Sequence, residues 1–269
     1  MKLWAIADLH VGFAENREAV EATPPHPEDW LIVAGDAGDT PAQLDIVLRT
    51  LTPRFRQLVW VPGNHDLWTP RDLPAQQRGV AHYERLVALC QRYGVLTPED
   101  PFAAWPGEGP RRAIVPLLLL YDYSFAPDEV GPEGAVLWAR QGGLRSADEE
   151  LLDPHPYLTR GAWCHARVHA AQSRLAALPS DVRLILVNHF PLRADLAVLP
   201  RIPRFRVWCG TRLTEDWHRR FNVEVVIYGH LHLRASHTID GVRFEEVSLG
   251  YPRQWDRRRG IGPYLKRIL

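Results

Sequence analysis

The chain is poor in cysteine and has no long apolar run, and each shortage excludes a class of protein. The 269 residues include only three cysteines, Cys90, Cys164 and Cys209, an odd and widely spaced set that fits neither a disulfide framework nor a structural zinc ribbon. No apolar run approaches the roughly 18 residues of a membrane span, and the first residues, MKLWAIADLH, read as a strand and not as a signal peptide. We therefore expect a cytoplasmic protein without a membrane segment.

The chain also lacks net charge, because 32 lysine and arginine side chains balance 32 aspartates and glutamates. Bulk binding of nucleic acid needs a net basic surface, so this balance argues against it. The charge is uneven along the chain, however. Residues 1–192 hold 17 basic and 24 acidic side chains, whereas residues 193–269 hold 15 basic and 8 acidic ones. Arginine is concentrated in residues 193–220 and 253–259. These arginines either lie on solvated faces and reflect the codon usage of a GC-rich genome, or they form a surface for an acidic partner.

Short apolar runs alternate with helical patterns, which predicts an α/β fold. The 46% of hydrophobic residues can supply a sizeable core at this length. We expect strands at 2–7, 30–34, 57–61, 113–121, 182–187 and 223–228, and a hairpin of 235–239 and 242–248 turning at Asp240-Gly241. We expect helices at 41–52, 79–93, 161–178 and near 211–221. Without a repeat or a linker, residues 1–269 are predicted to form one domain with large inserts near 124–160 and 190–210.

Five short polar clusters each follow one of these apolar runs. They are Asp8-Leu9-His10, Gly35-Asp36-Ala37-Gly38-Asp39, Gly63-Asn64-His65-Asp66, Asn188-His189 and Gly229-His230-Leu231-His232. In open α/β sheets the ligand crevice lies at the carboxyl ends of the strands, so the clusters should converge on one edge. Carboxylates, imidazoles and an amide oxygen suit borderline divalent metals such as manganese, iron or zinc better than calcium. One such cluster is common, but five in this order predict a metal site.

In these clusters the sequence resembles the calcineurin-like metallophosphoesterase superfamily, whose motifs D-x-H, G-D-x-x-D, G-N-H-D/E, H and G-H-x-H are all present. The resemblance implies a four-layer α/β/β/α sandwich and a metal-dependent phosphoric diester hydrolase. It also implies two divalent metal ions, manganese or iron or both, with zinc as an alternative. By position, the implied ligands of the first ion are Asp8, His10, Asp36 and His232. Asp36 would bridge to the second ion, completed by Asn64, His189 and His230.

The same resemblance implies roles for residues that do not bind metal. His65 would face the phosphoryl group and either stabilise its charge or protonate the leaving alkoxide. Its neighbour Asp66 would orient the His65 ring. Asp39 has two interpretations, a role near the metals or the N-cap of the helix that begins at Pro41.

Further segments resemble a narrower, actinobacterial subgroup of this superfamily. They include VWVPGNHDLWT at 59–69, LVNHFPL at 186–192 and GVRFEEVSLGYPRQW at 241–255, and the similarity runs from about residue 3 to about residue 257. The resemblance implies removal of 4′-phosphopantetheine from holo acyl carrier protein, which leaves the apo form. Since carrier proteins are typically acidic, the arginine-rich segments 193–220 and 253–259 are the expected docking surface.

Two other functions compete with this one. A nuclease or a small-molecule phosphodiesterase of the cyclic nucleotide type could use the same dinuclear site, and a nuclease predicts a basic stripe with stacking aromatics. A non-enzymatic interaction module predicts loss of ligand positions, yet all of them are present. The ten tryptophans, Trp68 and Trp208 among them, are either core and loop anchors or walls of a cleft for a large organic arm.

Overall fold

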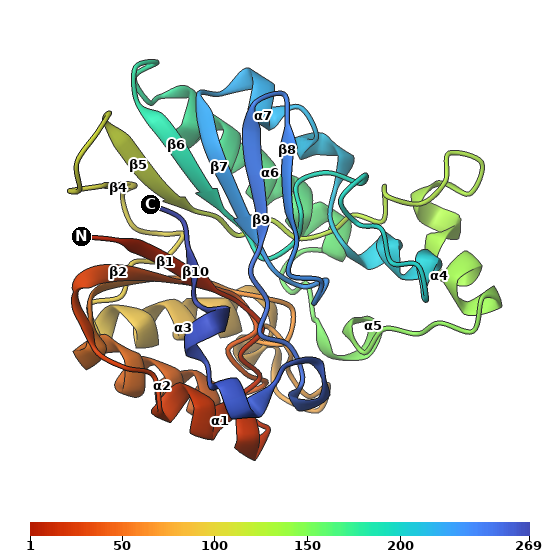
Figure 1. Cartoon of the computed structure of the whole chain (residues 1–269). Helices are drawn as coiled ribbons and strands as arrows, with labels where there is room; N and C mark the ends of the chain where they lie inside the picture. Colours follow the sequence, from red (N-terminus) through yellow and green to blue (C-terminus); the bar gives the residue numbers. More distant parts are fainter.

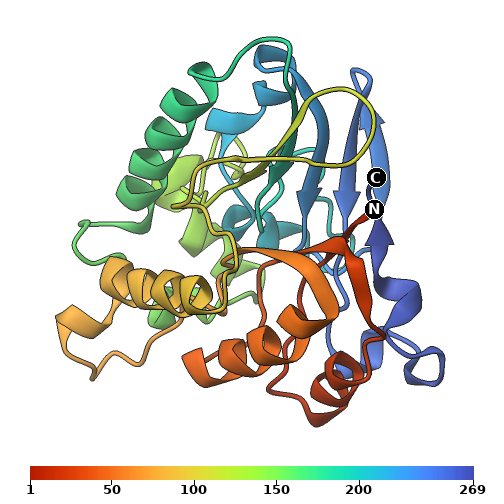
Figure 2. The same cartoon turned by 90° about the vertical axis from the view of Figure 1, so that its left-hand side faces the viewer.

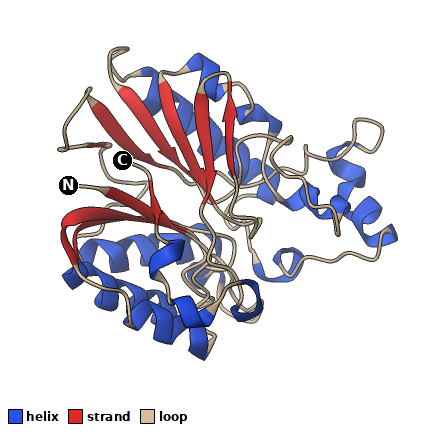
Figure 3. Cartoon of the chain, viewed as in Figure 1, coloured by secondary structure: helices blue, strands red, loops and turns tan.

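The computed structural model describes residues 1–269 and contains two sheets that face each other (Figure 1, Figure 3). The first sheet has the order β10-β1-β2-β3 and consists of β1 (Leu3–Ile6), β2 (His26–Ala34), β3 (Phe55–Val61) and β10 (Lys266–Arg267). The second has the order β4-β5-β6-β7-β9-β8 and consists of β4 (Ala103–Ala104), β5 (Arg112–Pro116), β6 (Arg183–Val187), β7 (Val223–Tyr228), β8 (Ser236–Ile239) and β9 (Val242–Glu246).

Helices cover the outer side of each sheet (Figure 2). The first sheet is covered by α1 (Ala14–Glu21), α2 (Pro41–Leu51) and α3 (Gly79–Arg92). The second is covered by α6 (Arg160–Ala176) and α7 (Trp217–Arg220). This arrangement confirms the predicted four-layer α/β/β/α sandwich. None of the helices has the length and apolar character that a membrane crossing requires.

The strands are apolar on both faces because each sheet is buried between two layers. One face of each sheet points into the space between the sheets, where one apolar cluster includes Leu3, Ala5, Ile32, Val59, Ile114, Ile185, Val225 and Ile227. The alternate residues point toward the helices, and their cluster includes Leu31, Val33, Trp60, Leu186 and Val226. Because successive side chains of a strand point to opposite faces, each strand contributes residues to both cores.

The parallel pairing of the strands brings the motif clusters to one edge. β1, β2 and β3 are parallel, as are β5, β6, β7 and β9, so their carboxyl ends point the same way within each sheet. The two sheets meet at this edge, where the Ala7 N–H donates to the Val247 carbonyl (3.0 Å) and the Leu249 N–H donates to the Ala7 carbonyl (2.8 Å). The clusters of both sheets therefore face each other.

Two expected elements are much shorter in the structure, whereas others differ by only one or two residues at an end. The strand expected at 113–121 ends at Pro116, and an Asn188 side chain then replaces the ladder, because its Oδ1 accepts from the Leu119 N–H at 2.9 Å. The helix expected near 211–221 is a 3₁₀ turn, η4 (Arg212–Thr214), followed by the four-residue α7. Helix α1 and strand β10 were not predicted.

The segments predicted as inserts contain short helices. Residues 124–160 include α4 (Gly131–Gln141) and α5 (Asp148–Leu151), and residues 190–210 include the 3₁₀ helix η3 (Pro203–Trp208). In Figure 1 these helices extend away from the two sheets, on the side where the carboxyl ends of the strands meet. Both segments are therefore placed to contribute to a site at that edge.

Candidate metal centre

The structure brings all seven predicted metal ligands into one cluster at the ends of five strands. Asp8 and His10 follow β1, Asp36 follows β2, Asn64 follows β3, His189 follows β6, and His230 and His232 follow β7. Four of them converge as a first group. His232 Nε2 lies 3.0 Å from Asp8 Oδ1 and 3.4 Å from His10 Nε2, which in turn lies 4.0 Å from Asp36 Oδ2. These donors could hold one cation.

The second group shares Asp36 with the first. His189 Nε2 lies 3.3 Å from Asp36 Oδ2, and His230 Nδ1 lies 3.1 Å from Asn64 Oδ1. His189 Nε2 is buried and has no hydrogen-bond partner, which is rare for a polar atom in a protein core. A cation between these donors would satisfy that nitrogen, so the residues fit a second divalent ion.

Neighbouring side chains and carbonyls orient the candidate ligands. His189 Nδ1 lies 2.9 Å from the Ala34 carbonyl, and His232 Nδ1 lies 2.8 Å from Gln254 Oε1. Each ring therefore donates its Nδ1–H away from the cluster and turns Nε2 toward it. The Ser248 hydroxyl donates to Asp8 Oδ2 at 2.6 Å. Sequence reasoning missed Gln254 and Ser248, for which the only signal was the similarity of the segment 241–255 to the actinobacterial subgroup.

The backbone at the cluster is strained. Five of the candidate ligands have left-handed φ angles, which are uncommon for residues other than glycine and collect at functional sites: Asp8 (54°), His10 (42°), Asp36 (53°), His230 (69°) and His232 (55°). Two glycines make room for the carboxylates, because a Cβ at Gly63 would overlap Asp36 Oδ1 and a Cβ at Gly229 would overlap Asp8 Oδ2.

Burial and charge set the protonation of the imidazoles. Burial lowers the pKa of His10 to about 4 and that of His230 to about 3, so both rings are neutral at pH 7, as metal-binding imidazoles must be. Burial also acts on His189, but the Asp36 carboxylate outweighs it and raises the pKa of His189 to about 10. His189 thus holds a proton that a cation would displace.

The structure corrects the predicted role of Asp66. Its carboxylate does not orient the His65 ring but accepts hydrogen bonds from the backbone N–H groups of Asp36 (2.8 Å), Ala37 (3.1 Å) and Gly63 (2.9 Å). Consecutive side chains point in different directions here, so Asp66 ties the loops after β2 and β3 together while His65 faces the cluster.

Asp39 takes the role predicted for Asp66. His65 Nδ1 lies 2.8 Å from Asp39 Oδ1, and the other ring nitrogen, Nε2, lies 3.9 Å from Asp36 Oδ2. The N-cap of α2 is Thr40, whose hydroxyl accepts from the Gln43 N–H at 3.3 Å. Of the two interpretations of Asp39, the one near the metals therefore agrees with the structure.

Two hollows open beside the cluster. One, of about 560 Å³, is lined by His10, Phe13, Glu15, Asp39, His65, Tyr251, Pro252 and Arg253. The other, of about 260 Å³, reaches the candidate ligands and has an apolar wall of Leu199, Ile202 and Phe205. His65, Tyr251 and Arg253 border both hollows. Trp208 is fully buried as an anchor, whereas Trp68 is half-buried and its ring lies 3.6 Å from the His65 ring.

Comparisons with known proteins identify the family of the chain. Residues 1–234 match the sequence profile of the calcineurin-like phosphoesterases. The chain is 46% identical over 269 residues to the acyl-carrier-protein phosphodiesterase PptH of Mycobacterium tuberculosis, a match that covers 99% of this chain and 83% of that protein. The crystal structure of phosphopantetheinyl hydrolase (PptH) from Mycobacterium tuberculosis superposes with a TM-score of 0.93, over 100% of this chain and 95% of that chain. The superfamily resemblance is thus confirmed, and the chain belongs to the calcineurin-like phosphoesterase family.

Proposed function

We propose that this protein hydrolyses the phosphodiester between 4′-phosphopantetheine and the serine of a holo acyl carrier protein, releasing the apo form. The observation that carries the proposal is the 46% identity to an acyl-carrier-protein phosphodiesterase over 99% of this chain. The donor cluster is consistent with it, because every ligand position and the His65–Asp39 pair are present in one site. The reaction needs the class of enzyme that the family supplies, a metal-dependent phosphodiester hydrolase.

In this proposal the site holds two divalent ions. Asp8, His10, Asp36 and His232 ligate the first, and Asp36 with Asn64, His189 and His230 ligates the second. Nitrogen and oxygen donors of these types suit manganese and iron, with zinc as an alternative. When bound, two such ions polarise the phosphoryl oxygens and lower the pKa of a water to supply a nucleophile. Elemental analysis of the purified protein identifies the metals.

His65 supplies the proton that the leaving group needs. Its Nδ1 is held by Asp39, so Nε2 faces the cluster. As the bond between phosphorus and the serine oxygen breaks, the His65 Nε2–H donates its proton to the departing alkoxide. A serine alkoxide is a poor leaving group, so this proton transfer matters more for a carrier protein than for an activated aryl ester.

The hollows beside the cluster suit an organic arm better than a nucleic-acid strand. The apolar wall of Leu199, Ile202 and Phe205 offers a surface for the alkyl groups of a pantetheine arm. Arg253 is the only lysine or arginine that lines either hollow, and Glu15 and Asp39 lie nearby. A channel for single-stranded nucleic acid is instead positively charged along its length. The lining therefore favours the carrier-protein substrate over the nuclease alternative.

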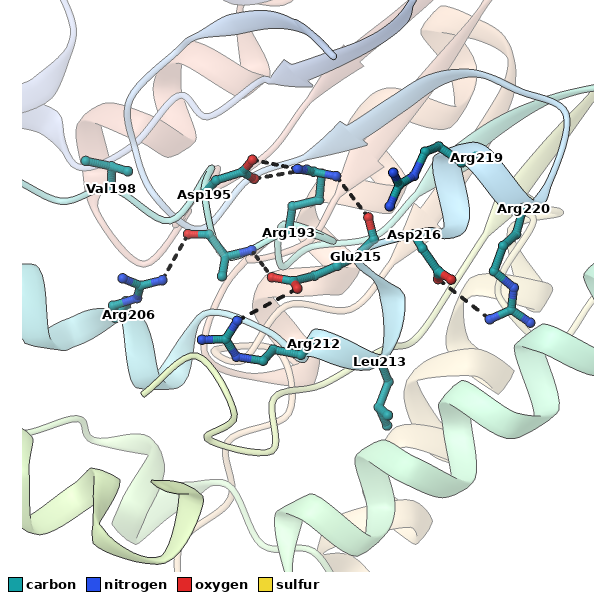
Figure 4. Close-up of a pocket in the computed structure, with 11 residues that line it drawn as sticks. Arg193, Asp195, Val198, Arg206, Arg212, Leu213, Glu215, Asp216, Arg219 and Arg220 are labelled. Carbon is teal, nitrogen blue, oxygen red and sulfur yellow. Dashed lines mark hydrogen bonds and ion pairs between the residues drawn. The ribbon is translucent and has the colours of Figure 1, made fainter. Parts of the chain in front are cut away.

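A third hollow, of about 760 Å³, is the candidate docking surface for the carrier protein (Figure 4). Five arginines line it together with Asp195, Glu215 and Asp216: Arg193, Arg206, Arg212, Arg219 and Arg220. Arg193 is paired with Asp195 at 2.6 Å, but Arg219 lies 4.0 Å from the nearest carboxylate oxygen, that of Asp240. Arg206 makes a single side-chain hydrogen bond, to the Ala194 carbonyl at 3.4 Å, and no ion pair. Arg206 and Arg219 thus remain available to an acidic partner.

The 3₁₀ helix η3 connects the hollow to the metal cluster. Helix η3 carries Arg206 on the side of the hollow and Phe205 on the side of the cluster, where the Phe205 ring lies 5.9 Å from the His230 ring. Because the scissile bond is attached to the carrier's own serine, the carrier must sit directly at the mouth of the site. In the segment 253–259, by contrast, Arg257 and Arg258 pair with Glu15 and Asp256, and Arg253 is the one arginine that lines a hollow beside the cluster.

Intact-mass measurement tests the proposed function. The manganese-loaded protein is incubated with a purified holo carrier protein, and we expect the carrier to lose the whole phosphopantetheine group. A His65→Ala variant is the control, because it should bind metal but lose most turnover. An unchanged carrier alongside degraded single-stranded DNA would instead establish the nuclease alternative.

A further inference from the structure

A carboxylate from the segment 124–160 reaches the metal cluster. Asp148, the first residue of α5, is 1% exposed. Its Oδ1 accepts two hydrogen bonds, from Asn64 Nδ2 at 3.0 Å and from Trp68 Nε1 at 2.7 Å. Asn64 directly precedes His65 and Trp68 follows it by three residues, whereas Asp148 lies 84 residues from Asn64. No motif of the sequence includes Asp148.

The first hydrogen bond determines which end of the Asn64 amide faces the cluster. An asparagine side chain has a donor end and an acceptor end of nearly the same shape, and only the oxygen can ligate a cation. Trp68 Nε1 can only donate, so Asp148 Oδ1 is an acceptor and therefore binds the Nδ2 end of Asn64. Asn64 Oδ1 is thereby turned toward His230, whose Nδ1 lies 3.1 Å away.

The second hydrogen bond holds the Trp68 ring, which packs against His65. The Trp68 and His65 ring centroids are 3.6 Å apart and the ring planes are inclined by 34°. The Trp68 ring therefore covers one face of the imidazole, while Asp39 holds its Nδ1. Because Trp68 Nε1 has Asp148 as its partner, the same carboxylate oxygen that orients Asn64 also anchors this ring.

Helix α5 is anchored by contacts outside the metal cluster. Glu149 accepts from Trp208 Nε1 at 2.7 Å and from the Tyr123 hydroxyl at 2.9 Å, and it pairs with Arg160 at 3.1 Å. Arg160 also donates to the Asp148 carbonyl at 2.6 Å. These contacts hold Asp148 in place from the side of α5, which makes it a rigid support for the groups that it binds.

We propose that Asp148 is a positioning residue that orients Asn64 toward the second metal ion and, through Trp68, holds the His65 ring. In this proposal the segment 124–160 contributes directly to the site through Asp148. The proposal rests on the two-metal function proposed above, but its primary test needs no carrier protein. Metal binding to the apo protein measures the Asn64 contact, and kinetics with a simple phosphodiester measure the His65 contact.

The first experiment titrates manganese into apo protein and follows it by electron paramagnetic resonance and calorimetry. Asp148→Leu keeps the number of heavy atoms but removes both acceptors. We expect it to bind the first ion as the wild type does and the second about 10- to 100-fold more weakly, as loss of a ligand's hydrogen-bond partner typically causes. Asp148→Asn keeps an acceptor oxygen and should restore the second ion. Asp153→Asn, which breaks a pair with Arg78 away from the site, is the matched control.

The second experiment separates the Trp68 contact. Trp68→Phe removes the Nε1–H donor together with part of the indole ring, and it leaves Asp148 and Asn64 in place. We expect it to bind both ions normally but to lower kcat, with little change in KM, on a phosphodiester with an unactivated phenyl leaving group. On a p-nitrophenyl ester, whose leaving group needs no proton, the loss should be much smaller.

The outcomes are distinct. Unchanged binding of the second ion by Asp148→Leu overturns the proposal for Asn64, as does an Asp148→Asn variant that is as defective as Asp148→Leu. A Trp68→Phe variant with wild-type kinetics overturns the proposal for His65. If Asp148→Leu does not fold, Asp148→Ala replaces it. A wild-type protein that binds fewer than two ions refutes the two-metal function itself, so the two failures are told apart.

Discussion

His65 Nδ1 lies 2.8 Å from Asp39 Oδ1, which joins the candidate acid to the loop that follows β2. The contact orients the ring and favours its protonated form. Asp39→Asn should therefore lower kcat by about 10- to 100-fold, a fraction of the full effect of a general acid, and leave KM nearly unchanged. The loss should be larger for holo carrier protein than for a p-nitrophenyl phosphodiester, which steady-state kinetics on both substrates would show.

Thr40→Ala is the control for this variant. It removes the N-cap of α2 but leaves Asp39 in place, so it should cost about 1 kcal/mol of unfolding free energy without changing kcat. Equal losses of kcat in the two variants would mean that Asp39 acts only by supporting the loop.

Gln254 should affect the first metal ion in the way that Asp148 affects the second. Its Oε1 accepts from His232 Nδ1 at 2.8 Å, so Gln254→Leu should weaken the first ion by about 10- to 100-fold. Gln254→Glu keeps an acceptor and should retain most of the affinity. Manganese titration of the apo variants measures both, and a Gln254→Leu protein that instead lost the second ion would contradict the assignment of ligands.

The glycines beside the carboxylates should not tolerate a side chain. Gly63→Ala places a Cβ on Asp36 and should impair both ions, since Asp36 is shared, whereas Gly229→Ala displaces Asp8 and should impair the first ion alone. Overpacking of this kind typically costs about 1–3 kcal/mol, measurable by urea unfolding. Gly262→Ala is the control, because no atom lies within 4 Å of its Cβ position.

Metal should stabilise the protein, and more so at higher pH. In the apo protein Asp36 raises the pKa of His189 to about 10, so protonated His189 contributes stability below its unfolded pKa, and this is lost as the pH rises toward 10. A cation replaces that proton, so its affinity should rise over the same range. At a concentration 100 times its Kd an ion contributes about 2.7 kcal/mol. Thermal melts at pH 6 and pH 8 would show a difference in Tm, with and without manganese, that is larger at pH 8. The same difference at both pH values would contradict the assignment of His189.

Charge reversal in the arginine-lined hollow should separate docking from chemistry. Arg206→Glu combined with Arg219→Glu should raise KM for a holo carrier protein but leave hydrolysis of a p-nitrophenyl phosphodiester unchanged. The effect should shrink as salt is added, because exposed charges are screened. Arg111→Glu, just before β5 and away from the metal cluster, is the control. Equal effects of the two changes on KM would place docking elsewhere.

The parts of the fold that could be predicted are those with local signals. The apolar run 223–228 coincides with β7, and the helix expected from Pro41 begins at that residue. The end of β5 at Pro116 could not be predicted. The Asn188 side chain that takes over the hydrogen bonding beyond this residue lies 69 residues from Leu119 in the sequence.

The sequence by itself determined the α/β alternation and the candidate ligands, since each polar cluster directly follows its own apolar strand and the parallel pairing carries all such ends to one edge. Only the tertiary structure decided which side chains orient those ligands. Asp39 instead of Asp66 holds His65, Gln254 holds His232, and Asp148 holds Asn64. The physical reason is that a hydrogen bond depends on direction and on distances of about 3 Å. A pattern along the chain sets neither for residues that loops and inserts bring together.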